Sequence, residues 1–147
     1  MSADLSELNL NDDFEKALTV PEASRWKSEK VGALEVLATL SPVGQPEETF
    51  QARLLWNRYP DDPPSLKFRD PATGRLDLPS AWPKVRGFRP NSLDACVSWC
   101  SEGMNLHPEW RNDPRFRWDA RGNVLLKILR ILQEELDEHF QGRYGDL

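Results

Sequence analysis

The sequence lacks the features that mark nucleic-acid-binding, secreted and membrane proteins. Nineteen Lys and Arg against twenty-four Asp and Glu give a formal charge of −5, and no dense basic patch offers a binding face to phosphate groups. Residues 1–16 carry neither the basic n-region nor the apolar core of a signal peptide, and no apolar run is long enough to span a bilayer. These absences predict a cytoplasmic protein with no nucleic-acid and no membrane partner.

Cysteine is scarce too, since the chain has only Cys96 and Cys100, in the stretch DACVSWCSEG. A reducing compartment keeps both as thiols, and a pair four residues apart would close too short a loop to stabilise a fold. Adding His107 gives a Cys-x3-Cys-x6-His set, but zinc sites generally have four ligands in closely spaced pairs, so we do not expect a metal site here. Two roles stay open for each cysteine: a small buried apolar residue, or a nucleophile activated in an exposed electropositive place.

Length and composition predict one domain preceded by a polar arm. The 147 residues are enough to bury a single core. Residues 1–30 form the arm, with a short helix at NDDFEKAL that is capped by Asn11 or Asp12 and followed by Pro21. Residues 31–147 form the domain itself.

Two apolar periods indicate the elements of this domain. Alternation of apolar and polar side chains predicts three strands of one antiparallel meander, over residues 31–42, 47–60 and 65–68. From the N-cap Asn123, apolar residues recur at helical spacing, which predicts an amphipathic helix of about eighteen residues. Its acidic face, residues 134–138, is predicted to be solvated or to contact a partner. The fold class is therefore α+β, with the meander packed against the helix.

Residues 69–121, between the third strand and the helix, show no sustained period of either kind. They hold six prolines and four of the six tryptophans. A long irregular segment inside one domain is generally either functional or disordered, and this one is too aromatic for disorder. We therefore expect the functional site in this segment.

A proline-rich stretch, YPDDPP from Tyr59 to Pro64, stands between the second and third predicted strands. Proline lacks a backbone donor and fixes its φ angle, so Pro60, Pro63 and Pro64 end the strand and turn the chain rigidly. The stretch resembles the Tyr-Pro-x-x-Pro-Pro signature of ubiquitin-conjugating enzymes, and the order of elements around it is similar to theirs over most of the chain. The resemblance implies a UBC-like fold, with residues 31–147 as the catalytic domain and a long irregular active-site segment.

What the resemblance implies for function is a cysteine that accepts a ubiquitin-like modifier as a thioester. The partners would be the modifier, a ubiquitin-activating-like enzyme that delivers it, and a target protein whose amine receives it. The chemistry requires a nucleophilic thiolate and a hydrogen-bond donor for the developing oxyanion, and no cofactor. So compact a form resembles the conjugating enzymes of bacterial operons that are implicated in antiphage defence.

The family's cysteine lies in an extended apolar stretch, and ACVSW around Cys96 reproduces that pattern better than the surroundings of Cys100 do. We therefore favour Cys96 as nucleophile, with Cys100 as the alternative. The family's His-Pro-Asn tripeptide has its nearest match in Arg89-Pro90-Asn91, which makes Asn91 the candidate oxyanion donor, although an Asn after a proline is also a common turn residue. Replacement of the histidine by Arg89 favours a rival interpretation, a UBC-like module that has lost catalysis and only binds a ubiquitin-like protein or another partner.

Overall fold

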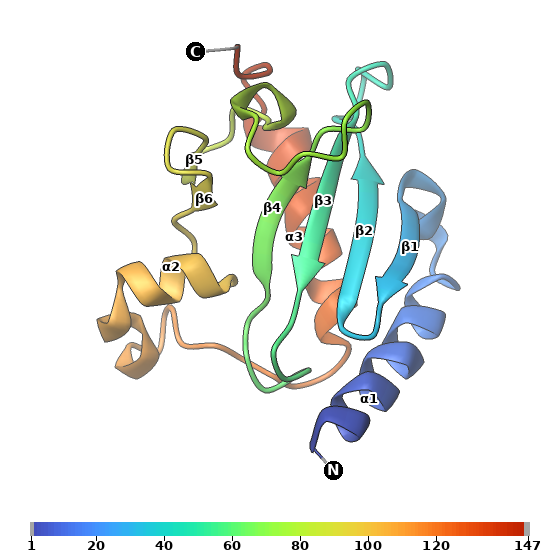
Figure 1. Cartoon of the computed structure of the whole chain (residues 1–147), viewed down its shortest axis with the longest axis vertical. Helices are drawn as coiled ribbons and strands as arrows, with labels where there is room; N and C mark the ends of the chain where they lie inside the picture. Colours follow the sequence, from blue (N-terminus) through green and yellow to red (C-terminus); the bar gives the residue numbers. More distant parts are fainter. Residues whose placement is uncertain (1, 146–147) are drawn as a thin grey trace.

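A four-stranded antiparallel sheet with helix α3 across one face forms the centre of the protein (Figure 1). The structure is a computed structural model that describes residues 2–145, with side chains from residue 5 onwards. The helices are α1 (Ser2–Ala17), α2 (Ser101–Leu106) and α3 (Val124–His139), and three 3-10 turns are η1 (Pro21–Arg25), η2 (Pro79–Ala81) and η3 (Pro108–Asn112). The strands are β1 (Lys27–Gly32), β2 (Glu35–Leu40), β3 (Phe50–Leu55), β4 (Ser65–Arg69), β5 (Phe88–Arg89) and β6 (Asp94–Ala95). No helix within residues 2–145 is long and apolar enough to cross a bilayer.

The predicted antiparallel meander is confirmed for β2, β3 and β4, which pair in sequence order. The extent of the first predicted strand is wrong, because residues 31–42 contain the end of β1, a turn and the whole of β2. Strand β1 itself was not predicted. Its sequence, KSEKVG, contributes no buried side chain, because the strand lies at the edge of the sheet. It therefore lacks the alternating apolar pattern by which a strand is recognised in a sequence.

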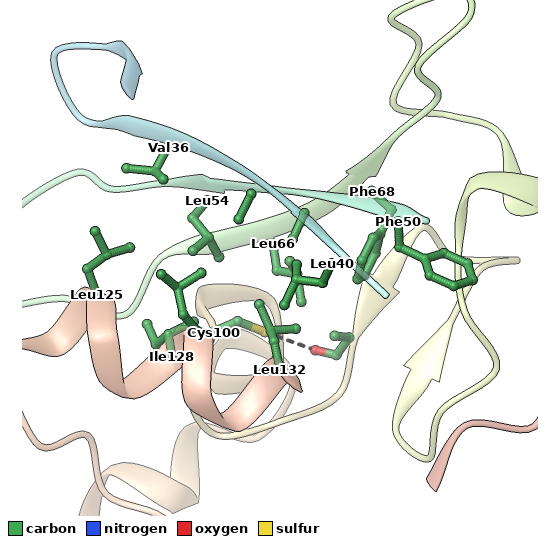
Figure 2. Close-up of a cluster of buried hydrophobic side chains, with 14 of the residues drawn as sticks. Val36, Leu40, Phe50, Leu54, Leu66, Phe68, Cys100, Leu125, Ile128 and Leu132 are labelled. Atoms are coloured by element: carbon green, nitrogen blue, oxygen red, sulfur yellow. Dashed lines mark hydrogen bonds between the residues drawn. The ribbon is translucent and has the colours of Figure 1, made fainter. Parts of the chain in front are cut away.

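The core lies between the sheet and α3, as the two periods predict. Every second residue of β2, β3 and β4 is buried, and so are Val124, Leu125, Ile128, Leu129, Leu132 and Leu136 of the helix. Figure 2 shows the strand side chains facing the helix side chains across this layer. The predicted N-cap is confirmed, because the Asn123 side chain accepts a hydrogen bond from the backbone N–H of Leu126 at 3.0 Å.

The N-terminal region is more ordered than the predicted arm with its short helix. Helix α1 begins nine residues earlier than NDDFEKAL, buries Leu10 and Ala17, and contacts α3. The Asn123 amide donates to the backbone oxygen of Asp13 at 2.9 Å, and the Trp26 indole donates to Gln133 at 3.1 Å. The boundary predicted after residue 30 falls inside β1. Leu10 of α1 belongs to the same hydrophobic core as the buried residues of the sheet.

The segment predicted to be irregular does contain regular elements, all of them short. Strands β5 and β6 have two residues each and α2 has six. Elements of this length are too short to generate a recognisable apolar period. The sequence therefore predicts neither the β5–β6 hairpin nor helix α2.

Tyr59 fixes the start of the proline stretch. It is 2% exposed, and its hydroxyl donates to the Asp13 carboxylate and accepts from the backbone N–H of Leu125 at 3.0 Å. Its own backbone N–H donates to the Ser6 hydroxyl at 3.1 Å. Burial raises the pKa of Tyr59 well above its usual value, so the hydroxyl keeps its proton. One side chain thus joins the loop before β4 to both α1 and α3.

Tyr59→Phe should therefore lower the free energy of unfolding by about 1–3 kcal/mol, because it leaves the Leu125 N–H without its partner inside the core. Urea denaturation monitored by tryptophan fluorescence measures the change. Tyr144→Phe is the matched control, since that hydroxyl makes a single bond of 3.2 Å to Phe88 in a half-buried place. Equal losses in the two variants would contradict a special role for Tyr59.

Candidate functional site

The β5–β6 hairpin presents Cys96. Phe88 pairs with Ala95 and Arg89 with Asp94, and the Arg89 guanidinium binds the Asp94 carboxylate with two hydrogen bonds of 2.8 and 3.0 Å. The backbone N–H of Cys96 then donates to the carbonyl of Gly87 at 2.7 Å. Cys96 is therefore the first residue after the hairpin, and its backbone is held against the opposite strand.

The Cys96 side chain is partly exposed and lines a surface hollow of about 380 Å³. Four aromatic residues line the same hollow: Phe88, Trp99, Trp110 and Phe116. Their rings pack in two pairs, with centroids 6.4 Å apart for Phe88 and Trp99 and 5.1 Å apart for Trp110 and Phe116. A thiol thus opens into an apolar hollow that solvent can enter, the kind of place in which binding sites are found.

Charged groups accompany the thiol. The Arg86 guanidinium lies 3.4 Å from Oε1 of Glu135, and both residues line the hollow. The other carboxylate oxygen, Oε2, is buried and has no hydrogen-bond partner among the described residues. The pKa of Arg89 is raised, chiefly by its hydrogen bond to Asp94 and to a smaller extent by the nearby Cys96 side chain. The thiol therefore has a cation nearby, and the hollow beside it holds a carboxylate with one unpaired oxygen.

Cys100 has the opposite environment. It is 0% exposed, and its thiol donates to the carbonyl of Ala95 at 3.1 Å. Figure 2 shows it among Leu66, Ile128 and Leu132, between the sheet and α3. Burial raises the pKa of Cys100 to about 12, so it remains a protonated thiol at neutral pH. In this arrangement Cys100 can pack and donate a hydrogen bond, but it cannot meet a protein-sized electrophile.

The structure does not bring Asn91 to Cys96. Asn91 is exposed in the turn of the hairpin, and both the Arg89–Asp94 pair and the Phe88–Ala95 pair lie between it and the thiol. No hydrogen bond of its side chain occurs within the described part of the chain, which agrees with a turn residue. Ser98 follows Cys96 by two residues and lines the same hollow, and its side chain carries a hydroxyl group.

The third residue of the zinc set, His107, stacks on Trp110 with ring centroids 4.3 Å apart, and its Nδ1 lies 3.0 Å from a Glu109 carboxylate oxygen. Cys100, by contrast, points into the core. Across residues 2–145, no group of three or more His, Cys, Asp or Glu side chains is placed to hold a metal ion.

The proline stretch is joined to helix α2, which follows Cys96. The carbonyl of Pro64 accepts the backbone N–H of Ser101 at 2.8 Å. The Glu102 carboxylate accepts from the Ser65 hydroxyl at 2.5 Å and from the backbone N–H of Leu66 at 3.1 Å. The end of the stretch and the start of β4 thus hold the first turn of α2 in place, which links the motif to the site physically.

Iodoacetamide should modify Cys96 in the native protein at least about ten times faster than Cys100, because alkylation of a buried thiol requires local unfolding. Peptide mapping by mass spectrometry at successive times measures both rates. In guanidinium the two cysteines should react alike, which provides the control. Preferential labelling of Cys100 in the native protein would contradict the arrangement described.

Comparison with protein-family models gave no match, and no curated protein and no solved structure matched the chain either. What bears on function is therefore the chain's own geometry: a partly exposed cysteine and a carboxylate that line one aromatic hollow, next to a hairpin and a short helix that the proline stretch holds.

Proposed function

We propose that the protein is a ubiquitin-conjugating-enzyme-like acyl carrier, in which Cys96 accepts a ubiquitin-like modifier from an activating enzyme and passes it to a target amine. The observation that carries the proposal is the contrast between the two cysteines: Cys96 opens into the aromatic hollow, whereas Cys100 is sealed in the core. The Tyr59–Pro64 motif and the order of meander, cysteine segment and helix support it. The setting we propose is a bacterial conjugation pathway that acts in antiphage defence.

The first step is a transfer between thiols. The Cys96 thiolate attacks the modifier's C-terminal carbonyl, a tetrahedral oxyanion forms, and the activating enzyme's thiolate leaves, so one thioester replaces another. The Arg89–Asp94 pair closes the hairpin that ends at Cys96 and so holds the attacking residue in place. The Ser98 hydroxyl is the side-chain donor that we assign to the oxyanion.

The second step is aminolysis. The target amine attacks the carbonyl of the Cys96 thioester, the bond from carbon to sulfur breaks, and an amide forms while the thiolate leaves. The attacking nitrogen must lose a proton, and we assign its acceptance to the Glu135 carboxylate, which lines the same hollow. The aromatic walls exclude part of the water and so strengthen the attraction between this carboxylate and an incoming ammonium group.

A second candidate function is binding without catalysis. It is favoured by the position of Asn91, which lies away from Cys96, and by Arg89 in place of the family's histidine. In that case the hollow would bind a modifier or another partner without covalent attachment. The two candidates differ in one observable, a covalent adduct that a reducing agent cleaves.

Incubation with ATP, a ubiquitin-activating-like enzyme and its ubiquitin-like modifier should give a thiol-sensitive adduct, seen on a non-reducing gel. Cys96→Ala should abolish the adduct, and Cys96→Ser should give one that resists thiols, because an alkoxide leaves less readily than a thiolate. Cys100→Ala should still form the adduct and serves as the control. Absence of adduct in the parent, while the activating enzyme itself becomes charged, would favour the binding module.

Glu135→Gln should slow the transfer of the modifier from Cys96 to free lysine by about tenfold or more, because glutamine keeps the shape but cannot accept the proton. Formation of the thioester should be unchanged, since that step needs no amine. Glu134→Gln is the matched control, as it removes a charge from an exposed position on the same helix. Similar rates in the two variants would show that Glu135 does not accept the proton.

A further inference from the structure

Helix α2 lies directly against the peptide that follows Cys96. A Cβ atom built on Gly103 would come within 2.6 Å of the backbone nitrogen and 2.7 Å of the carbonyl carbon of Val97, and nearer still to its carbonyl oxygen. These are backbone atoms, so they cannot rotate away as the end of a flexible side chain can. The approach of α2 to residues 95–97, here called the Cys96 segment, therefore requires glycine at position 103.

The Cys100 thiol binds the same segment. Cys100 occupies the N-cap position of α2, yet its side chain makes no capping hydrogen bond. Its Sγ donates instead to the carbonyl of Ala95 at 3.1 Å and lies 3.7 Å from the carbonyl of Val97. These two carbonyls flank Cys96 in the chain. Because burial raises the pKa of Cys100 to about 12, the proton needed for donation is present at neutral pH.

The opposite side of the segment is held by Gly87. Its carbonyl accepts the backbone N–H of Cys96 at 2.7 Å, and its φ of +85° is one that residues with a side chain rarely adopt. A Cβ atom on Gly87 would lie 3.1 Å from Cγ1 of Val97 and 3.3 Å from the carbonyl oxygen of Cys96. The backbone of the segment is thus enclosed between Gly87 and α2, while the Cys96 side chain still reaches the hollow.

We propose that Cys100 and Gly103 are positioning residues, which hold the backbone of the Cys96 segment so that the thiol enters the hollow in one orientation. The proposal rests on the function proposed above for Cys96. Neither residue lines the hollow, so both act through the backbone. Aminolysis needs the thioester carbonyl in a defined position relative to the amine, and small displacements of reacting atoms slow such steps strongly.

The support on which this arrangement depends is itself fixed. Glu102 ties α2 to the first residues of β4, and the N–H of Ser101 binds the carbonyl of Pro64. If α2 made no contacts with the sheet, it could move together with the Cys96 segment. Because Glu102 binds α2 to the start of β4, α2 can instead keep the segment in a fixed position.

The test compares Cys100→Ala, Cys100→Ser and Gly103→Ala with Asn105→Ala, an exposed position on α2 that serves as the matched control. Preformed thioester is discharged to lysine in single-turnover reactions. Cys100→Ala and Gly103→Ala should still become charged but should discharge about tenfold more slowly. Cys100→Ser should recover most of the rate, because a hydroxyl group can donate to the same carbonyl.

Two further measurements separate positioning from loss of stability. Alkylation of Cys96 by iodoacetamide, a small reagent that needs no defined orientation, should be as fast as in the parent or faster in Cys100→Ala. Hydrogen exchange of the Cys96 amide, which binds Gly87, should become about tenfold faster in that variant and stay unchanged in Asn105→Ala. If the substitutions merely lowered the stability of the fold, discharge of the thioester would slow to the same extent in Cys100→Ala and in Cys100→Ser.

The proposal would be overturned if folded Cys100→Ala discharged its thioester, and exchanged the hydrogen of the Cys96 amide, at the same rates as the parent protein. If Gly103→Ala does not fold, the comparison of alanine with serine at position 100 decides the question alone. If the parent forms no adduct, the proposed function fails, and amide exchange in Cys100→Ala then decides whether the segment is held as described. If the parent forms the adduct but Cys100→Ala shows unchanged rates of amide exchange and of discharge, the proposed function is kept and the positioning role is rejected.

Discussion

The buried hydroxyl of Tyr59 is the contact on which the geometry around Cys96 depends most. It fixes the start of the proline stretch to α1 and to the first turn of α3, and five residues later the carbonyl of Pro64 binds the first turn of α2. A loop stiffened by three prolines therefore sets the spacing between the two helices. Glu135 comes from α3, and Cys96 is joined to α2 by residues 97–100, so the same loop helps to set the spacing between carboxylate and thiol.

The two cysteines differ because α2 begins directly after Cys100, and the chain turns inward at that point. Residues 96–99 run along the edge of the hollow, and α2 then starts at Ser101 with Cys100 facing the core. A thiolate in an apolar interior is disfavoured by desolvation, so the buried cysteine loses the chemistry of a nucleophile while keeping that of a donor. The sequence leaves the choice between them open, because four residues can separate two exposed thiols as easily as an exposed and a buried one.

The elements that can be predicted from the sequence are those in which apolar residues repeat at strand or helix spacing over a sufficient length. Strands β2 to β4 and helix α3 follow from their patterns, whereas β1 is a polar edge strand and α2 is too short to show a period. For the site, the spacing in sequence does not reveal that the hairpin turn carries Asn91 away from the strand end where Cys96 lies. The place of Glu135 in the aromatic hollow is not predictable from sequence either, because the charged face of an amphipathic helix is generally solvated and only the tertiary structure places Arg86 and the aromatic walls beside it.

The acidic end of α3 explains why Glu135 differs from its neighbours. Acids near a helix C-terminus are unfavourable, and Asp137 is compensated by two hydrogen bonds of 2.8 Å from Arg25. Glu135 is compensated only in part, by an Arg86 side chain that is 72% exposed, while its second oxygen is buried without a partner within residues 2–145. Glutamine at this position would keep the packing and avoid the cost of burying a charge. A carboxylate that lines an aromatic hollow and is paired only with an exposed arginine is instead suited to a cation that arrives and leaves, as the target ammonium group does in the aminolysis that we propose.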